Sequence, residues 1–343
     1  MTRGRIRTAA TAVCALAVAT LLSAGKEDNG ITIFMIGDST MANKKIDGGA
    51  KERGWGMALP CFFDDGVTID NHAVNGRSSK SFIDEGRWET VKAKIRSGDY
   101  VFIQFGHNDE KPKPDRHTDP GSTFDDNLRL FVRETRERGG IPVLFNSVVR
   151  RNFLKEAPEN DDDEALRNTV GPTGVAADEE GDVLVDTHGD YVVAPRNVAE
   201  EQDVVFIDAN KITHDLEQGL GKEGSKKLHM WFLPGEEPSV PKGRQDNTHY
   251  NVYGAHVVAR LLAAAVGKEI KELRKHLVDY DYAVAADGTG DFFSVQDAVD
   301  SAPDGEKTTI QLFAGTWDKP VIPAGKKVKF ILREGAAWAT AGE

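Results

Sequence analysis

The fold is decided by one stretch, Ile31-Thr32-Ile33-Phe34-Met35-Ile36-Gly37-Asp38-Ser39-Thr40, in which an apolar run leads directly into a glycine and polar residues. The run is short, rich in β-branched isoleucine and preceded by Asn29-Gly30, which predicts a fully buried parallel strand rather than a helix. Ser39 would then lie at the carboxyl end of that strand, the edge at which open α/β sheets bind their ligands. The stretch therefore predicts an α/β fold with a serine at its functional edge.

The same residues also have a simpler interpretation. Gly-Asp-Ser is a common turn sequence, because glycine tolerates positive φ and the Asp and Ser side chains bond the local backbone. On its own, the stretch leaves two interpretations of Ser39 open, a nucleophile and a turn residue. The choice depends on what the other strand ends carry.

Apolar runs alternate with amphipathic stretches along the chain, which is typical of a parallel sheet covered by helices. Strands are predicted at residues 31–36, 67–70, 100–105, 141–145 and 203–208. Helices are predicted at residues 81–95, 124–138, 212–220 and 254–277. Residues 51–56, 151–196 and 222–245 are predicted to be loops or irregular segments. We expect a three-layer α/β/α sandwich around a five-stranded parallel sheet, of the flavodoxin-like kind.

Asp246 and His249 are candidates for the general base and for the carboxylate that orients it. They are three residues apart, a spacing at which the carboxylate can reach one imidazole nitrogen while the other faces Ser39. A serine nucleophile needs both partners. A surface cap with a nearby histidine is the alternative interpretation of the pair.

Gly76 and Asn108 each follow a predicted strand and are candidates for the oxyanion hole. The donors would be the backbone N–H groups of Ser39 and Gly76 and the side-chain amide of Asn108. Ordinary turn residues are the alternative interpretation of Gly76 and Asn108. The chain lacks the Gly-x-Ser-x-Gly elbow, which disfavours an α/β-hydrolase of the usual kind.

Several of these residues also have side chains that bind zinc. A metal site built from His107, Asp109, Asp246 and His249 remains an alternative, because imidazoles and carboxylates are zinc ligands. Since the serine mechanism needs no metal, we expect neither a metal nor a cofactor.

Four blocks in this order resemble the SGNH (GDSL) hydrolases: Gly37-Asp38-Ser39, Gly76, Gly106-His107-Asn108-Asp109 and Asp246-x-x-His249. Their flanks narrow the resemblance to the rhamnogalacturonan acetylesterases, as do Asp186-Thr187-His188-Gly189 and Asn251-x-Tyr253-Gly254-Ala255. The resemblance covers residues 31–266. It implies an SGNH fold and an O-acetyl group on pectin as the substrate.

The resemblance also implies a role for each block. Ser39 would be the nucleophile, His249 the base and Asp246 the residue that orients it. Ser39, Gly76 and Asn108 would form the oxyanion hole. Asp38 would be structural, and His107 and Asp109 would hold the loop of their block.

Residues 1–25 are predicted to be a secretory signal peptide. Arg3, Arg5 and Arg7 precede the apolar stretch 9–22, and Ser23-Ala24-Gly25 offers small residues for cleavage. An uncleaved membrane anchor is the alternative. We expect a secreted or periplasmic protein that has no contact with the membrane after cleavage. Since Cys14 would leave with this segment, Cys61 would remain alone and no internal disulfide would form.

The charge of the chain restricts its partners. The formal net charge is −12, and removing three arginines with the signal peptide makes it −15. Such an acidic surface argues against nucleic acid as a partner. An acidic polysaccharide would need a local basic patch, for which Arg77, Lys80 and Arg87 are candidates. A solvated basic face is the alternative interpretation of these three residues.

Residues 281–343 start a different pattern, which we expect to follow a hydrolase domain at 26–267 and a helical linker at 268–280. A Gly288-Thr289-Gly290-Asp291-Phe292 turn, a short helix at 293–303 and strands at 308–313 and 327–332 resemble the opening of the pectin methylesterases. That family forms right-handed parallel β-helices. Its catalytic residues lie beyond the point reached at Glu343, so we expect a small, incomplete β-helix fragment without methylesterase activity.

The sequence therefore predicts a secreted carbohydrate esterase that removes O-acetyl groups from acetylated pectic polysaccharide. Three alternatives remain. The chain could be a pectinesterase-type protein that de-esterifies pectin, as the resemblance of its C-terminal segment suggests. It could also be a broad-specificity SGNH lipase or esterase, or a non-catalytic pectin-binding protein.

Overall fold

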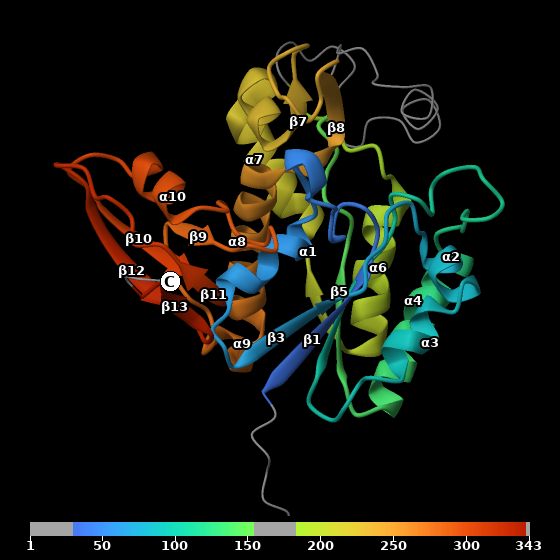
Figure 1. Cartoon of the computed structure of the whole chain (residues 1–343). Coiled ribbons are helices and arrows are strands. Elements are labelled where there is room, and N and C mark those ends of the chain that lie inside the picture. The colour runs from blue at the N-terminus through green and yellow to red at the C-terminus, as the bar shows by residue number, and fades with distance from the viewer. Residues whose placement is uncertain (1–29, 154–182, 341–343) are drawn as a thin grey trace, which may run out of the picture.

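The structure, a computed structural model, describes residues 30–153 and 183–340. The predicted signal peptide lies outside the described residues, as does the part of the predicted 151–196 loop that covers 154–182. Five parallel strands form the central sheet in the order β3-β1-β4-β5-β6 (Figure 1). They are β1 (Ile31–Gly37), β3 (Val67–Asn71), β4 (Tyr100–Gln104), β5 (Ile141–Phe145) and β6 (Val205–Ile207). All five predicted strands are confirmed.

Helices cover both faces of this sheet, because successive side chains of a strand point to opposite faces. Ile33 and Met35 of β1 belong to one buried cluster, whereas Phe34 and Ile36 belong to another. The first cluster packs against α1 (Trp55–Ala58), α7 (Ala209–Ser225), α8 (Val252–Glu269) and α9 (Lys271–Arg274). The second packs against α2 (Ser79–Asp84), α3 (Arg87–Lys92), α4 (Thr123–Glu137) and α6 (Asp190–Gln202). The predicted three-layer sandwich is therefore confirmed.

Two predicted helices are each interrupted. The helix expected at 81–95 is two helices, α2 and α3, with Gly86 between them in the left-handed conformation at φ 68°. The helix expected at 254–277 ends at Glu269, where Ile270 is extended before α9 begins. Apolar periodicity continues across both breaks, so it could not locate them.

Three segments predicted as irregular contain regular structure. Residues 51–56 include β2 (Glu52–Arg53) and the start of α1. Residues 222–245 include the end of α7, a 3-10 helix (Lys226–Leu228), β7 (His229–Phe232) and the start of β8 (Arg244–Asn251). The described end of the 151–196 loop contains the first turns of α6. Strand β2 has two residues and pairs with the distant β8, which a local sequence pattern does not reveal.

The order β2-β8-β7 gives a small antiparallel sheet beside the main one. Glu52 pairs with Asn251, and Arg53 pairs with Tyr250. The segment that carries Asp246 and His249 is therefore a strand, β8, held on both sides. This pairing fixes the backbone from which both side chains project.

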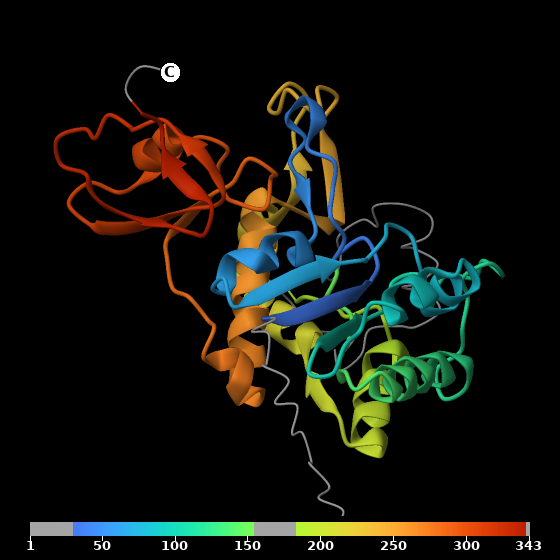
Figure 2. The same ribbon diagram turned by 60° about the horizontal axis from the view of Figure 1, so that its bottom comes forward.

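The C-terminal part consists of parallel strands around one short helix. The elements are β9 (Tyr282–Val284), α10 (Val295–Ser301), β10 (Lys307–Leu312), β11 (Gly315–Trp317), β12 (Lys327–Leu332) and β13 (Ala336–Trp338). Strand β10 pairs with β9 and β12, and β11 pairs with β13, all in parallel. These strands lie to one side of the main sheet, next to α8 (Figure 2). The resemblance to a β-helix stays a prediction.

Within the described ranges, no helix is both long and apolar enough to span a bilayer.

Candidate active site

Ser39 lies where the sequence places it, directly after β1 at the carboxyl edge of the sheet. The turn that holds it is closed by backbone hydrogen bonds from the N–H groups of Met41 and Ala42 to the Asp38 carbonyl. The buried Asp38 carboxylate accepts hydrogen bonds from the backbone N–H and the hydroxyl of Thr40, at 2.9 and 2.8 Å. Asp38 therefore has the structural role that the resemblance implies, and the Ser39 side chain is left to face outward.

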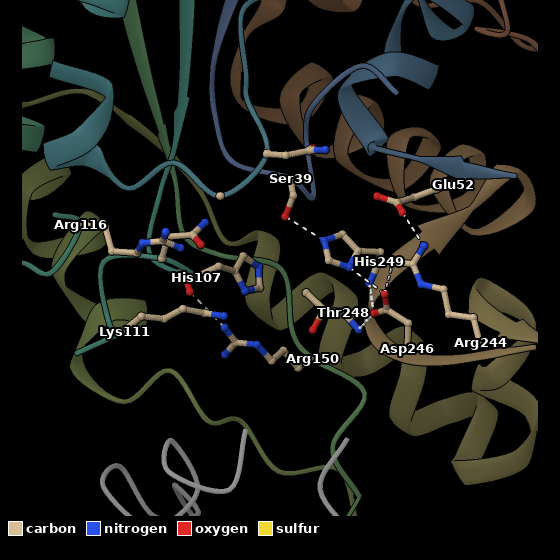
Figure 3. Close-up of a pocket in the computed structure, with 13 residues that line it drawn as sticks. Ser39, Glu52, His107, Lys111, Arg116, Arg150, Arg244, Asp246, Thr248 and His249 are labelled. Atoms are coloured by element: carbon tan, nitrogen blue, oxygen red, sulfur yellow. Dashed lines mark hydrogen bonds and ion pairs between the residues drawn. The ribbon is translucent and has the colours of Figure 1, made fainter. Parts of the chain in front are cut away.

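His249 and Asp246 approach Ser39 from β8. His249 Nε2 lies 2.9 Å from Ser39 Oγ, and His249 Nδ1 lies 2.9 Å from Asp246 Oδ2 (Figure 3). The other carboxylate oxygen, Asp246 Oδ1, accepts from the backbone N–H groups of Thr248 and His249, both at 2.8 Å. The three predicted residues thus form one continuous row of hydrogen bonds.

The Asp246 carboxyl is held in its ionised form. Burial would raise its pKa, but the hydrogen bond and charge of His249, together with the charge of Arg244, outweigh burial and hold the pKa well below its usual range. An ionised carboxylate accepts the Nδ1–H of His249, so Nε2 presents a lone pair to the Ser39 hydroxyl. This is the arrangement in which a histidine can remove a serine proton.

Sequence reasoning missed the ion pairs that hold Asp246. Arg244 Nη2 donates to Asp246 Oδ2, and Arg244 Nη1 donates to Glu52 Oε2 at 2.6 Å. Lys44 Nζ completes the row with Glu52 Oε1 at 2.7 Å. Arg244 lies two residues before Asp246 on β8, so both project from the same face of the strand. That alternation was visible in the sequence, but Glu52 joins through the β2–β8 pairing, which was not.

Gly76 and Asn108 line the same cavity as Ser39 and His249. Gly76 has a φ of 74°, and the nearest heavy atom to a Cβ built there is Arg116 Nη1 at 4.0 Å. Glycine is therefore favoured at this position because of the positive φ, and the site has room for a Cβ. The Asn108 amide donates to the Arg77 carbonyl at 3.2 Å. Since an amide nitrogen carries two hydrogens, one donor is left for an oxyanion.

The cavity has a volume of about 420 Å³ and is lined by polar side chains and glycine. The 13 lining residues drawn in Figure 3 include no aliphatic side chain. They are Ser39, Glu52, Asn75, Gly76, His107, Asn108, Lys111, Arg116, Arg150, Arg244, Asp246, Thr248 and His249. A neighbouring cavity of about 540 Å³ shares Glu52, Asn75 and Arg244 with the first and adds apolar residues such as Val74, Met230 and Val240.

The basic side chains at the cavity are not those that the sequence suggested. Arg77 and Arg87 both pair with Glu85, which lies between α2 and α3, and Lys80 pairs with Asp84 on α2. The solvated-face interpretation of these three residues is therefore the right one. The cavity is lined instead by Lys111, Arg116, Arg150 and Arg244.

The four candidate metal ligands do not come together as a group. Asp109 is buried and accepts hydrogen bonds from Ser79, Thr118 and Gly106, so it ties the block's loop to α2 as expected. Burial raises its pKa to about 7. Asp246 is bonded to His249 and Arg244.

Among the described residues, a different set of histidine and carboxylate atoms gathers within 4.8 Å: those of His107, Glu110 and His188. Arg150 Nη2 bonds Glu110 Oε1 and so supplies the positive charge that this carboxylate needs. His107 and His188 bond each other, with 3.1 Å between Nδ1 and Nε2. We therefore assign no metal to this set.

Comparison with known proteins identifies the family. The GDSL-like Lipase/Acylhydrolase family matches residues 35–257. The chain is 39% identical over 248 residues to rhamnogalacturonan acetylesterase RhgT of Bacillus subtilis (strain 168), covering 72% of this chain and 94% of that protein. It is 29% identical over 245 residues to the probable rhamnogalacturonan acetylesterase YesY of the same organism, covering 70% of this chain and 93% of that one.

A solved structure shows the same fold. The B. subtilis protein YxiM superposes with a TM-score of 0.54 at 24% identity, over 70% of this chain and 57% of that one. The resemblance to the SGNH (GDSL) hydrolases is thus confirmed over the part of the chain that contains all four blocks. The chain belongs to the GDSL-like Lipase/Acylhydrolase family and is an ester-hydrolysing enzyme.

Proposed function

We propose that the chain is a serine carbohydrate esterase that removes O-acetyl groups from acetylated pectic polysaccharide, rhamnogalacturonan in particular. The observation that carries the proposal is the hydrogen-bonded row Ser39, His249 and Asp246 on the wall of a polar cavity. The names of the two Bacillus relatives support the choice of substrate.

In the first half of the reaction, Ser39 Oγ attacks the acetyl carbonyl carbon while its proton moves to His249 Nε2. The oxygen of the tetrahedral intermediate accepts hydrogen bonds from the N–H groups of Ser39 and Gly76 and from the Asn108 amide. The bond between the carbonyl carbon and the sugar oxygen then breaks, and His249 gives its proton to the departing sugar hydroxyl. Asp246 stabilises the imidazolium that exists between these two transfers.

In the second half, water replaces the sugar. His249 Nε2 takes a proton from the water as its oxygen attacks the acetyl-serine carbonyl. The bond to Ser39 Oγ breaks, acetate leaves, and the proton returns to the serine. The chemistry uses no group outside the chain and the water.

The lining of the cavity favours a sugar over a lipid. A long acyl chain gains affinity by burying hydrocarbon, which needs an apolar wall. The cavity at Ser39 is lined by charged groups, amides, imidazoles and hydroxyls instead. A carbohydrate can satisfy these groups with its hydroxyls and carboxylates.

A second candidate is an esterase of broader acyl specificity. The neighbouring cavity begins at Glu52, Asn75 and Arg244 and continues along Val74, Met230 and Val240, so an acyl chain that passes Asn75 would meet hydrocarbon there. Hydrolysis rates of p-nitrophenyl acetate and p-nitrophenyl octanoate separate the two candidates. We expect the acetate to be cleaved faster.

The C-terminal segment bears on the pectinesterase alternative. We propose that residues 281–340 form coils of a β-helix with a structural role. Parallel pairing of Lys307 with Lys327 and of Gly315 with Ala336, 20 and 21 residues apart, supports this, as does the parallel pairing of Tyr282 with Ile310, 28 residues apart, because stacked coils pair in parallel. Membership of an ester-hydrolysing family favours an enzyme over the non-catalytic pectin-binding alternative.

We also propose that the chain is exported and cleaved after residue 25. The three arginines, the apolar stretch and the small residues of this segment support export. Sequencing the N-terminus of protein recovered from the producing cell's medium or periplasm tests it. A protein that retains residues 1–25 would contradict the proposal.

Parallel assays of acetate and methanol release test the function. The purified chain is incubated with pectic polysaccharide that carries both acetyl and methyl esters. We expect acetate without methanol. Methanol without acetate would favour the pectinesterase alternative, and release of neither would contradict an esterase acting on pectin.

A further inference from the structure

Beside the catalytic row lies a second row of hydrogen bonds that the mechanism above does not use. Asp186 Oδ1 lies 2.6 Å from His188 Nδ1, and His188 Nε2 lies 3.1 Å from His107 Nδ1. Both rings are buried, with exposed fractions of 0% for His188 and 3% for His107. His107 ends this row and also lines the cavity that contains Ser39 (Figure 3).

The row determines where the ring protons are. Burial would raise the pKa of Asp186, but hydrogen bonds with His188 and from Asn210 lower it below the usual value. Asp186 is therefore an acceptor, and His188 Nδ1 carries a hydrogen. With one proton on each ring, His188 Nε2 accepts and His107 Nδ1 donates. Burial, with the charge of Arg150, holds the pKa of His107 well below its usual range, so this ring is neutral.

His107 Nε2 then carries a lone pair that can accept a hydrogen bond. In the part of the chain that the structure describes, this buried atom has no hydrogen-bond partner. A buried acceptor without a donor is costly, and such atoms in native proteins call for an explanation. His107 also lines the cavity that contains Ser39, and it immediately precedes Asn108, the candidate oxyanion donor, in the chain.

We propose that His107 Nε2 accepts a hydrogen bond from a free hydroxyl of the substrate's alcohol half, and that Asp186 and His188 hold His107 in the tautomer that can do so. The proposal rests on the function proposed above and adds a substrate requirement. An acetyl group offers no donor, so the hydroxyl has to belong to the sugar. A hydroxyl next to the ester is common in partly acetylated sugars and is absent from simple alkyl and aryl acetates.

The requirement for a free substrate hydroxyl can be tested by measuring the selectivity of the enzyme between two substrates. A site built to hydrogen-bond a hydroxyl rejects an analogue that lacks it, because its buried polar atom is then left without a partner. We expect about a 10- to 100-fold preference in kcat/KM for a monoacetylated galacturonide with a free neighbouring hydroxyl over the same compound with that hydroxyl methylated.

Two substitutions separate the effect of His107 Nε2 from the effect of Nδ1 in the same ring. His107→Asn keeps an N–H donor for His188 but removes Nε2, whereas His107→Gln keeps an amide near the Nε2 position. We expect His107→Asn to lose the preference for the free hydroxyl and His107→Gln to retain part of it. In both variants the rate on p-nitrophenyl acetate should fall by less than the rate on the sugar acetate, because p-nitrophenyl acetate offers no hydroxyl to His107 Nε2. His276→Asn, which removes a histidine bonded to Asp64 at the other edge of the sheet, is the matched control.

The outcomes decide the proposal. Retention of the full preference in His107→Asn would overturn it, as would an equal loss on the sugar acetate and on p-nitrophenyl acetate, which indicates a structural role. A wild-type enzyme that cleaves p-nitrophenyl acetate but no sugar acetate would contradict the proposed function instead.

Nitrogen NMR of the histidine rings gives an independent readout. We expect His107 in the form with the hydrogen on Nδ1 in the wild type, and a change in its tautomer in Asp186→Asn. A hydrogen on Nε2 of wild-type His107, which would follow if His188 carried protons on both nitrogens, would overturn the proposal.

Discussion

Two regions of this molecule are built from parallel strands, and they differ in how completely the strands are covered. In the main sheet, helices pack on both faces and every residue of β4 is buried. In the C-terminal sheet, α10 packs on one side, and β12 has no buried residue. The large exposed hydrophobic residues Val321, Ile322, Phe293 and Leu332, 75% to 40% exposed, also belong to this region. The candidate active site lies in the region whose sheet has helices on both faces.

The candidate active site is built on strands that their neighbours hold in place. Ser39, Gly76 and Asn108 follow strands β1, β3 and β4, which packing on both faces holds in a fixed register. Catalytic groups have to be held within a fraction of an ångström of their working positions. A region with one open face offers less support of this kind.

The two regions contact each other through hydrogen bonds between buried polar groups. Arg53, 2% exposed, donates through Nε to the Gly288 carbonyl at 3.0 Å. Gln311 donates to the Cys61 carbonyl at 2.7 Å, and Cys61 Sγ lies 3.2 Å from the Thr289 carbonyl. Cys61 is a free, buried cysteine in the described part of the chain. The buried polar groups here hold two parts of the chain together and do no chemistry.

Substitution of the nucleophile should have the largest effect. Ser39→Ala removes the atom that we propose attacks the ester, so we expect kcat to fall by more than about 10⁴-fold while the protein stays folded. Acetate release and circular dichroism together check this. Ser122→Ala, an exposed serine before α4, is the control. An active Ser39→Ala enzyme would mean that this edge of the sheet is not the site.

Substitution of the orienting carboxylate should have a slightly smaller effect. Asp246→Asn keeps the shape of the side chain but can favour the wrong tautomer of His249, so we expect kcat to fall by about 10³- to 10⁴-fold. Turnover of p-nitrophenyl acetate measures it. Asp215→Asn, an exposed aspartate on α7, should leave turnover unchanged. A loss below 10-fold would show that the row of hydrogen bonds is not catalytic.

Loss of one oxyanion donor should cost about 10²- to 10³-fold in kcat. Asn108→Ala removes the side-chain amide, and we expect KM to change little because the oxyanion exists only during the reaction. Steady-state kinetics separate the two parameters. Asn197→Ala on the exposed side of α6 is the control. A change confined to KM would place Asn108 in binding rather than in catalysis.

Arg53→Met tests the contact between the regions and should affect stability rather than chemistry. A buried hydrogen bond to a charged group is worth about 1.5 to 3 kcal/mol, so we expect the free energy of unfolding to fall by about 2 kcal/mol. Urea denaturation measures this change. Arg87→Met, whose partner Glu85 lies at the surface, should change it by less than about 1 kcal/mol. Equal effects would mean that the contact does not join the regions.

Lys80→Ala should have the smallest effect. The side chain forms an exposed pair with Asp84 and does not line the cavity. We expect a change of about 0.5 kcal/mol or less in stability and no change in acetate release from acidic polysaccharide. A marked rise in KM for the polysaccharide would restore the predicted basic patch on α2 and α3.

The residues that we propose for the reaction could be predicted because each has a recognisable place in the sequence. Ser39, Gly76 and Asn108 follow apolar runs, and Asp246 and His249 are spaced so that one side chain can reach the other. Such local patterns are informative because a polar residue that follows an apolar run in the sequence lies at the end of a strand in the folded structure.

The residues that support the site could not be predicted in the same way. Glu52 and Arg244 meet through the β2–β8 pairing, and they are 192 positions apart in the chain. Asp186, His188 and His107 likewise meet only once α6 packs against the sheet. The breaks at Gly86 and Ile270 were hidden for a related reason, because the apolar stripe continues across them and tertiary packing decides where each helix ends.

The central claim is that Ser39 carries the acetyl group during hydrolysis, and trapping that intermediate tests it most directly. The enzyme is mixed with acetylated rhamnogalacturonan oligosaccharide, quenched in acid within one turnover, digested and analysed by mass spectrometry. We predict one added acetyl group on the peptide that contains Ser39, and none after incubation with deacetylated oligosaccharide. Acetate release with the acetyl group on another residue, or with no acetylated peptide at any quench time, would contradict the account.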